Sequence, residues 1–393
     1  MNDVFLCFGK RTPIGRHAGA LAMLRPGVAA QVIDAVLAGA DLPIDEVIFG
    51  CANQAGEDNR NVARMAVLLS RLPQSVPALT VNRLCASGLD AVILGARAIA
   101  CGGVDLVIAG GVESMSRAPF VIAKAETGFD RHPRMFDTSL GWRFPNPQIA
   151  ARHGLESMAE TAENLAAEQA ISRADQDACA WRSQARYDAV WQARDIAPVT
   201  IADRKGGAVV VAADEHPRAT TIERLAALPT PFRVGGSVTA GNASGINDGA
   251  AAVLLASGAA VGRHGLTPLA RIGASASAGV APRLMGTGPI AAVARLCAQT
   301  GLAVADFEVI EVNEAFAAQV LACTRAWGLA DDAAHVNRHG GAIALGHPLG
   351  MSGTRIALSA ARQLHETGAR HALATLCVGT GQGVALALHA ARA

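Results

Sequence analysis

The sequence predicts an α/β protein in which a largely parallel sheet carries helices on its faces. Short apolar runs that end in Gly, Asn or polar clusters alternate with Ala-rich segments of helical length, and this alternation is typical of strands joined by crossover helices. The same texture returns after about residue 268. The strand candidates are Val4–Phe8, Glu46–Gly50, Ala78–Val81, Val104–Ala109, Phe307–Val312 and Ala372–Val378, and the helix candidates of the second part are Pro289–Gln299 and Ser352–Glu366.

The composition fits a compact protein with a large interior. The chain has 393 residues, 51% of them hydrophobic and only 17% charged, with 41 glycines. This length predicts two or three domains, and the composition excludes disorder as the main state.

Charge and hydropathy exclude two classes of partner. The net charge is +1, and no Lys/Arg run interleaved with aromatic residues is present to follow a phosphate backbone. The longest uncharged apolar stretch, Gly249–Gly262, is shorter than the roughly 20 residues that span a bilayer. Val4–Gly9 is too short for the apolar region of a signal peptide. We therefore expect a cytoplasmic protein that binds neither nucleic acid nor membranes.

The two ends of the chain show signs of duplication. Ala86-Ser87-Gly88 and Met351-Ser352-Gly353 each open a long helix, which is followed by a strand and a Gly-rich turn. Between them, charge and aromatic content rise, as in an inserted loop-rich unit that covers a site. The predicted domains are an N-terminal half of residues 1–116 with 247–267, an insertion of residues 117–246 and a C-terminal half of residues 268–393.

The eight cysteines do not form a metal-binding pattern. They show no C-x-x-C spacing and no histidine pair that could complete a zinc site, so we expect no metal. Cys85 is distinctive because it lies between a strand candidate and an Ala-rich helix, in the segment Val81–Gly88. The start of a helix favours a thiolate, although a buried cysteine at a tight turn is an equally good interpretation.

Three further segments carry candidate chemistry. His347 lies in the glycine-rich loop 337–350, whose backbone geometry is expected to be unusual, and its imidazole could accept a thiol proton. Cys377 enters a glycine turn at Gly379, where backbone N–H groups could stabilise an oxyanion. Asn313 and Glu314 follow a buried strand, where a polar pair is costly without a purpose. Each segment alone is also compatible with a purely structural role.

Together these segments resemble the thiolase family. Its members carry, in this order, N-R-x-C-x-S-G, N-E-A-F, G-G-A-I-A-L-G-H-P-x-G-x-S-G and C-x-G-x-G-x-G, and all four motifs occur here at family spacing. Arg11–Gly15, Gly110–Ser116 and Val238–Gly245 extend the resemblance from end to end. It implies the thiolase fold, in which duplicated βαβαβαββ halves form a five-layer α-β-α-β-α sandwich with an inserted loop domain.

The resemblance also implies roles for individual residues. Cys85 would take the acyl group, His347 would remove its proton, and Cys377 would move a proton on or off the α-carbon. One oxyanion hole would use His347 with a water held by Asn313, and the other would use the backbone N–H groups of Cys85 and Gly379. Kinetics should be ping-pong.

Coenzyme A is implied as a co-substrate, with no tightly bound cofactor. The matching positions are Ser244 beside the pantetheine, Arg218 near the nucleotide phosphates, and Met158, Ala315 and Phe316. The sequence departs from some relatives at Ser157, where a histidine is common, and at Thr380, where a glycine is frequent. By the same resemblance the protein is expected to be a homodimer or homotetramer.

Less common segments point to a substrate. Gly50–Arg64, Ser116–Phe120, Gly141–Phe144 and Ser172–Asp177 are similar to the 3-oxoadipyl-CoA thiolases of bacterial aromatic degradation, which would give succinyl-CoA and acetyl-CoA. The alternatives are an acetyl-CoA acetyltransferase (acetoacetyl-CoA thiolase), a general 3-ketoacyl-CoA thiolase or, more distantly, a non-catalytic acyl-CoA-binding scaffold. For the distal carboxylate we considered Arg143 and Arg152, whose simpler interpretation is as solvated surface residues.

Overall fold

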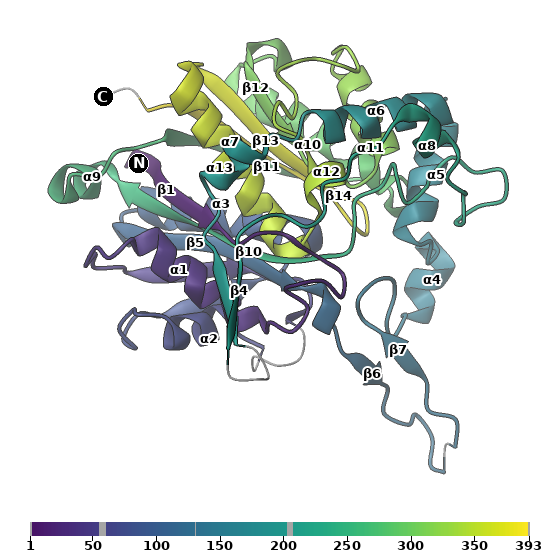
Figure 1. Cartoon of the computed structure of the whole chain (residues 1–393), viewed down its shortest axis with the longest axis horizontal. Coiled ribbons are helices and arrows are strands. Elements are labelled where there is room, and N and C mark those ends of the chain that lie inside the picture. Colours follow the sequence, from purple (N-terminus) through teal and green to yellow (C-terminus); the bar gives the residue numbers. More distant parts are fainter. Residues whose placement is uncertain (1, 55–59, 130, 203–206, 392–393) are drawn as a thin grey trace.

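The computed structural model describes residues 2–54, 60–129, 131–202 and 207–391. Residues 55–59 of the segment Gly50–Arg64 lie outside the described part. Most strands of the described chain join one large sheet (Figure 1). They are β1 (Val4–Arg11), β2 (Gly15–Arg16), β3 (Glu46–Gly50), β4 (Ala78–Val81), β5 (Leu106–Ser114), β10 (Asn247–Ser257), β11 (Ala270–Gly279), β12 (Val309–Val312), β13 (His371–Val378) and β14 (Gln382–Ala390).

The expectation of a largely parallel sheet is wrong, because the sheet is mixed. Its order is β12-β13-β14-β11-β1-β10-β5-β3-β4, and only the pairs β3–β4, β3–β5 and β12–β13 are parallel. β14 follows β13 through the short turn at Gly379–Gly381, and so short a connection can join only antiparallel strands. β10 returns from the long insertion and runs antiparallel to both β1 and β5.

The strand order confirms the duplicated fold. The order β1-β10-β5-β3-β4 in the first half corresponds to β11-β14-β13-β12 in the second. An isolated parallel bridge between Ile310 and Val336 stands where β4 stands in the first half. The halves join where Phe5 and Leu6 of β1 pair with Arg271 and Ala270 of β11.

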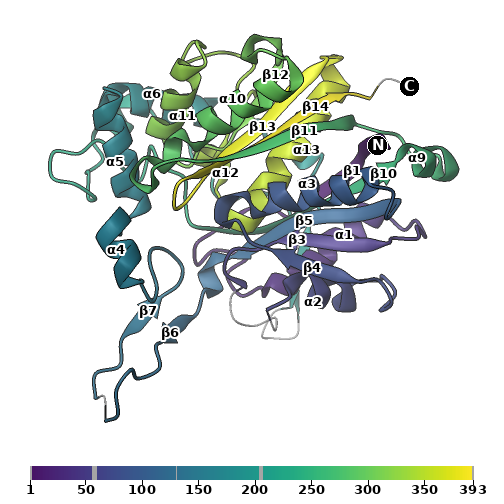
Figure 2. The same cartoon turned by 180° about the vertical axis from the view of Figure 1, so that it is seen from behind.

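Helices complete the five layers of the predicted α-β-α-β-α sandwich. The central pair is α3 (Ser87–Ala100) and α13 (Leu349–Thr367), which pack against each other and against strands of both halves (Figures 1 and 2). The outer helices are α1 (Ala29–Leu37), α2 (Val62–Leu69) and α9 (Gly258–His264) on the first half, and α10 (Gly288–Thr300) and α11 (Ala317–Ala326) on the second. Three buried apolar clusters fill the spaces between these layers.

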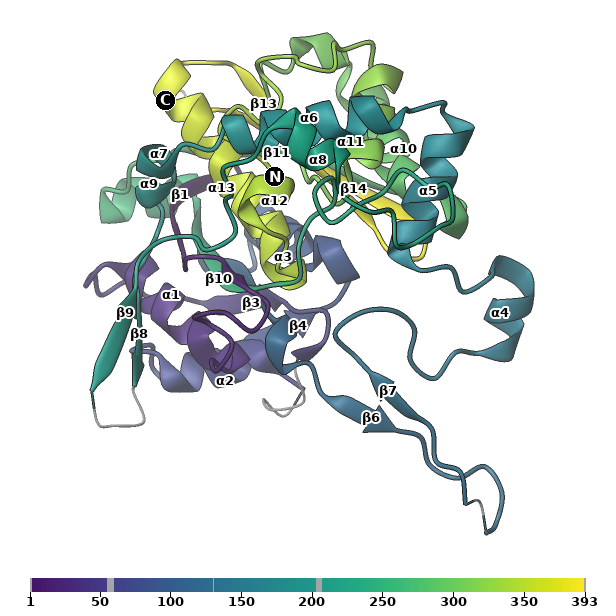
Figure 3. The same cartoon turned by 45° about the vertical axis from the view of Figure 1, so that its right-hand side comes forward.

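Residues 117–246 contribute no strand to the large sheet within their described part. The hairpin β6 (Phe120–Ile122) and β7 (Met135–Asp137) forms an arm that extends from the body, as Figure 3 shows. The remaining elements are α4 (Pro147–His153), α5 (Met158–Glu168), α6 (Arg173–Ala185), α7 (Ala189–Ala193), β8 (Val199–Ala202), β9 (Ala208–Val211) and α8 (Ile222–Ala226).

Local capping sets the starts of the helices that carry the insertion. Ser157 and Ser172 each accept the N3 backbone N–H, of Glu160 and Asp175 respectively, while the N3 carboxylate accepts the N–H of the serine. Asp188 caps the N-terminus of α7. In the described residues, no helix combines the length and apolar character needed to cross a membrane.

Candidate active site

Cys85 lies on a turn whose backbone is held by its neighbours. β4 ends at Val81, and the 3-10 turn η3 (Leu84–Ala86) leads directly into α3. Asn82 accepts the N–H of Leu84 at 2.9 Å, and Ser87 accepts the N–H of Arg83 at 2.9 Å. Leu84 adopts a left-handed φ of 46°, which an L-residue tolerates only when its surroundings fix it. The turn therefore presents Cys85 from a rigid frame.

The expectation that the helix start favours the Cys85 thiolate is wrong for the resting protein. Burial raises the pKa of Cys85 to about 11, although the backbone N–H groups of Gly379 and Cys85 act in the opposite direction. The two N–H groups lie beside the sulfur, but desolvation is the larger effect. Cys85 therefore rests as a thiol and needs a base to become a nucleophile.

His347 is fixed in one tautomer by Ser352. The Nδ1 atom lies 2.6 Å from the Ser352 hydroxyl oxygen, and that hydroxyl donates to the Pro348 carbonyl at 2.9 Å. Since the hydroxyl proton is used on Pro348, Nδ1 must carry the proton shared with Ser352. Nε2 then keeps its lone pair and is the proton acceptor.

The surroundings of His347 keep the ring neutral. Burial, followed by the charge of Arg355, lowers the pKa of His347 to about 3. Asn313 Nδ2 lies 3.4 Å from His347 Nε2, a position from which the amide can donate to the lone pair of Nε2. The imidazole is thus uncharged at neutral pH with its Nε2 lone pair free, although so low a pKa makes it a weak base for the Cys85 thiol in the resting protein.

The loop that carries His347 has the unusual backbone geometry that its glycines predicted. Gly346 has a φ of 102°, and a Cβ there would meet the amide of Asn247. The same amide oxygen accepts the N–H of His347 at 2.9 Å. Earlier in the loop, a Cβ at Gly341 would collide with the Glu314 carboxylate. The loop therefore depends on glycine where it packs on polar side chains.

Asn313 and Cys377 lie at the ends of two neighbouring parallel strands. Asn313 comes directly after β12, and its N–H bonds the carbonyl of Thr375 in β13 at 3.0 Å. Its Oδ1 is buried without a hydrogen-bond partner, so it can accept a bond from a substrate or water. Cys377 lies near the end of β13, where burial and then Cys85 raise its pKa well above the ordinary value. The two cysteines thus share one centre.

The first turns of α3 and α13 bring Cys85 and His347 to the same place. A Cβ at Gly88 would meet the Gly350 carbonyl, and one at Gly353 would meet Leu89, so these two helix starts are in direct backbone contact. In the sequence, this pair of Ser-Gly helix starts indicates duplication. In the structure, their contact also builds the site.

Cys377 belongs to a buried apolar cluster. The cluster also contains Met285 and Ala315, with Met158 and Phe316 packed against it. Ser244 lies beside this cluster, because its N–H bonds the Ala315 carbonyl at 3.0 Å. The structure therefore gathers four of the five predicted coenzyme A positions around the catalytic candidates.

Arg218, the fifth, lies farther along the same side. It borders a surface pocket of about 300 Å³ together with Arg16, His17, Glu215, His216 and Gly245, the last of which adjoins Ser244. Burial and then Arg218 lower the pKa of His216 to about 4. The two arginines are suited to a phosphate group, whereas the carboxylate of Glu215 opposes one.

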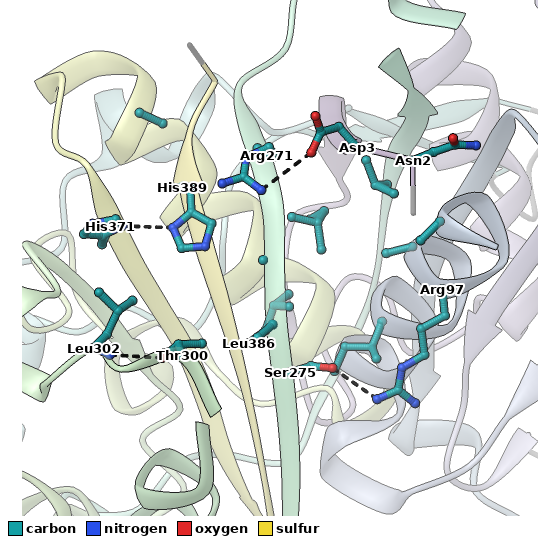
Figure 4. Close-up of a pocket in the computed structure, with 18 of the residues that line it drawn as sticks. Asn2, Asp3, Arg97, Arg271, Ser275, Thr300, Leu302, His371, Leu386 and His389 are labelled. Carbon is teal, nitrogen blue, oxygen red and sulfur yellow. Dashed lines mark hydrogen bonds and ion pairs between the residues drawn. The ribbon is translucent and has the colours of Figure 1, made fainter. Parts of the chain in front are cut away.

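A cavity of about 940 Å³ lies elsewhere, between α3 and the strands β11 and β14 (Figure 4). There Arg271 faces Asp3 at 3.7 Å, Arg97 donates to Ser275, and His371 contacts His389. The lining includes none of the predicted site residues, so the volume of this cavity is not evidence for the reaction.

Sequence reasoning missed Ser352 and Asn247 as partners of His347. Ser352 appeared as part of a helix start and of the G-H-P-x-G-x-S-G motif, but neither pattern states that its hydroxyl contacts the His347 ring. Asn247 is a hundred residues from His347 and meets it only through β10. A polar residue opening an otherwise apolar strand was the one available clue.

A deprotonatable thiol, a neutral imidazole, a second thiol and a lone amide on one duplicated α/β scaffold define an acyl-transfer centre that uses cysteine. Family comparison names the class. The model of the thiolase N-terminal domain matches residues 4–259, and that of the thiolase C-terminal domain matches residues 266–390. The chain belongs to the thiolase family and is an acyltransferase.

Individual relatives align along the whole chain. A beta-ketoadipyl-CoA thiolase of Pseudomonas putida is 56% identical, and the 3-oxoadipyl-CoA/3-oxo-5,6-dehydrosuberyl-CoA thiolase of Escherichia coli is 55% identical, each over 99% of both chains. Among solved structures, human mitochondrial 3-ketoacyl-CoA thiolase in complex with CoA superposes with a TM-score of 0.90 at 38% identity, covering 100% of this chain and 98% of that one.

Proposed function

We propose that the protein cleaves 3-oxoadipyl-CoA with coenzyme A to succinyl-CoA and acetyl-CoA, in the degradation of aromatic compounds. The observation that carries the chemistry is the joint position of Cys85, Cys377 and the Nε2 acceptor of His347. The names of the full-length relatives support the acyl chain.

The first half-reaction forms an acyl-enzyme. His347 Nε2 takes the proton of Cys85, and the sulfur attacks the 3-oxo carbon. The bond between C2 and C3 then breaks, which leaves succinyl on Cys85. The electron pair passes to C2, where the Cys377 thiol supplies the proton that completes acetyl-CoA. Burial suits both steps because it keeps each sulfur protonated until it reacts.

The second half-reaction releases the product. A new coenzyme A loses its thiol proton to the Cys377 thiolate, and its sulfur attacks the thioester on Cys85. Succinyl-CoA leaves, and the Cys85 thiolate recovers its proton from His347. Both halves return every group to its starting state, so ping-pong kinetics follow.

Hydrogen-bond donors would stabilise the oxyanions. The backbone N–H groups of Cys85 and Gly379 lie beside the Cys85 sulfur, where the oxygen of an acyl group bound there would project. For the other thioester oxygen we propose His347, whose Nε2 becomes a donor once it has taken the Cys85 proton, together with a water held by Asn313, whose Oδ1 has no partner among the described residues.

A narrow cleft of about 10 Å³ adjoins the apolar cluster and holds no more than about one water molecule, so it marks a position for the distal carboxylate and not a formed pocket. Met158 and Thr380 border it on the side of the cluster, and Trp142, His153, Glu156 and Arg283 form its outer part. The Arg283 guanidinium faces Glu168 at 3.4 Å, with about half of each side chain exposed, and so keeps donors for a ligand. We propose Arg283, with His153, as the partner of that carboxylate.

The two arginines considered earlier are less suitable. Arg143 donates to the Thr138 carbonyl at 3.2 Å, which directs it toward the base of the arm. Arg152 is exposed on α4 and does not border the cleft. Glu156 does border the cleft, and its carboxylate accepts a hydrogen bond from the Asn164 side chain at 2.9 Å.

The test is thiolysis of 3-oxoadipyl-CoA and acetoacetyl-CoA by the purified protein, compared as kcat/KM. A large preference for 3-oxoadipyl-CoA supports the proposal. A preference for acetoacetyl-CoA keeps the mechanism and replaces the substrate with that of an acetyl-CoA acetyltransferase. Turnover of neither thioester would overturn the catalytic proposal and favour an acyl-CoA-binding scaffold.

A further inference from the structure

Glu113 is a buried carboxylate that the mechanism above does not use. It lies in β5 between the two central helices, with 2% of its surface exposed. Its oxygens accept backbone N–H groups from Ala52 at 2.9 Å, Asn53 at 3.1 Å and Gly350 at 2.9 Å. Burial raises the pKa of Glu113, and the three backbone N–H groups oppose that rise by favouring the ionised carboxylate.

One arm of this network leads to Cys85. The carbonyl of Ala52 accepts from Asn82 Nδ2 at 2.9 Å. The other end of the same amide, Oδ1, accepts the N–H of Leu84 at 2.9 Å. Leu84 immediately precedes Cys85 and has the strained positive φ. A chain of hydrogen bonds therefore runs from Glu113 to the nucleophile turn.

The second arm leads to His347. Gly350 lies in the first turn of α13, three residues after His347, and its N–H points at Glu113. Negative charge at a helix N-terminus is favourable, because the first backbone N–H groups have no partner inside the helix. A Cβ at Gly350 would meet the carbonyls of Val112 and Gly50, so only glycine allows this approach.

We propose that Glu113 is a positioning residue that sets the Cys85 turn and the His347 loop relative to each other across the two halves of the fold. Other contacts join the helices, but this one carboxylate binds the backbone of Gly350 directly and reaches the Cys85 turn through Ala52 and Asn82. Its function would be to hold the thiol and its base at reacting distance. The inference rests on the proposed roles of Cys85 and His347.

Few titratable groups face Glu113. The Cys51 thiol lies 3.6 Å from Oε1 and is itself strongly desolvated. The negative charge of Glu113 also acts on Cys85, whose pKa it raises as a smaller effect than burial. Removing the charge should thus make Cys85 more acidic, while loss of alignment should make catalysis slower. Unfolding would also expose Cys85 and speed its alkylation, so the folded fraction of each variant is measured beside both readouts.

The experiment compares Glu113→Gln with the wild type in acetoacetyl-CoA thiolysis and in alkylation of Cys85 by iodoacetamide. Peptide mass spectrometry resolves Cys85 from the other cysteines. We expect kcat to fall about tenfold or more, since small misplacements of reacting groups have large effects, with the KM for coenzyme A within about twofold. Alkylation of Cys85 at pH 8 should become about twofold faster or more.

Two further variants keep the test decisive. Asp195→Asn is the control, because it removes a buried carboxylate that pairs with Arg362 toward the other end of α13. It should reduce stability without changing kcat per folded molecule. Asn82→Ala cuts only the Cys85 arm and should show the same loss of kcat, which keeps the test available if Glu113→Gln does not fold.

The outcomes distinguish the two proposals. Unchanged kcat in Glu113→Gln or in Asn82→Ala would overturn the positioning role while the wild type remains active. Turnover that falls only in proportion to the unfolded fraction, with faster alkylation confined to that fraction, would also overturn it and leave Glu113 a purely structural residue. A wild type that turns over no 3-oxoacyl thioester would instead contradict the proposed function itself.

Discussion

The Ser352 hydroxyl lies 2.6 Å from His347 Nδ1 and at the same time donates to the Pro348 carbonyl. Ser352→Ala would leave Nδ1 without an acceptor, so the ring could place its proton on Nε2 and lose its ability to act as a base. We expect kcat to fall roughly tenfold or more, with little change in KM. Steady-state thiolysis of acetoacetyl-CoA measures both quantities.

Ser359→Ala is the matched control for that substitution. Ser359 is a buried serine of the same helix, and its hydroxyl donates to Glu311 rather than to His347. Its loss should change stability by about 1 kcal/mol and leave kcat unchanged. Equal kinetic losses in both serine variants would contradict the tautomer argument.

The roles of the two cysteines can be separated by substitution. Cys85→Ala should abolish the acyl-enzyme, because the other thiol of the site, Cys377, does not have His347 as its base. Cys377→Ser should still accept an acetyl group from acetyl-CoA but should stop carbon–carbon cleavage, since a hydroxyl exchanges its proton with carbon far less readily. Intact-mass spectrometry after incubation with acetyl-CoA detects acylation, and an acetoacetyl-CoA assay reports cleavage. Loss of both steps in both variants would contradict the assignment.

The pKa of Cys85 predicts how its reactivity depends on pH. Burial raises this pKa to about 11, so the thiolate fraction should keep rising with pH well beyond the value for a free cysteine. Alkylation of Cys85 by iodoacetamide should increase about tenfold per pH unit between roughly pH 7 and pH 9. A cysteine-containing peptide, with a pKa near 8.5, is the control. A plateau for Cys85 below pH 8 would show that the resting form is already a thiolate.

The chemistry of the site was visible in the sequence, whereas its support was not. Cys85, His347, Asn313 and Cys377 lie in motifs with distinctive glycine patterns, and the structure places them together. Ser352, Asn247 and Glu113 act through contacts that depend on how the two halves pack, and no local pattern reports such contacts.

The fold shows the same division. The ends of β3 and β4 agree with the sequence prediction, because apolar runs bounded by polar residues fix them locally. The polar, helix-forming stretch 174–193 forms two helices and not one, since Asp188 caps a new start within it. The direction of each strand depends on the connections, so alternation of strands and helices alone predicted a parallel sheet where a mixed one forms.

The proposed partner of the distal carboxylate yields a prediction about specificity. Arg283→Gln should lower kcat/KM for 3-oxoadipyl-CoA about tenfold or more, because a charge-assisted hydrogen bond contributes roughly 1.5–3 kcal/mol, while activity on acetoacetyl-CoA should stay within about twofold. Arg143→Gln is the matched control and should leave this ratio unchanged, since its guanidinium is directed to Thr138. A shift of the ratio by Arg143→Gln alone would move the carboxylate site to the base of the arm. No shift in either variant would leave both arginines without a role in substrate choice.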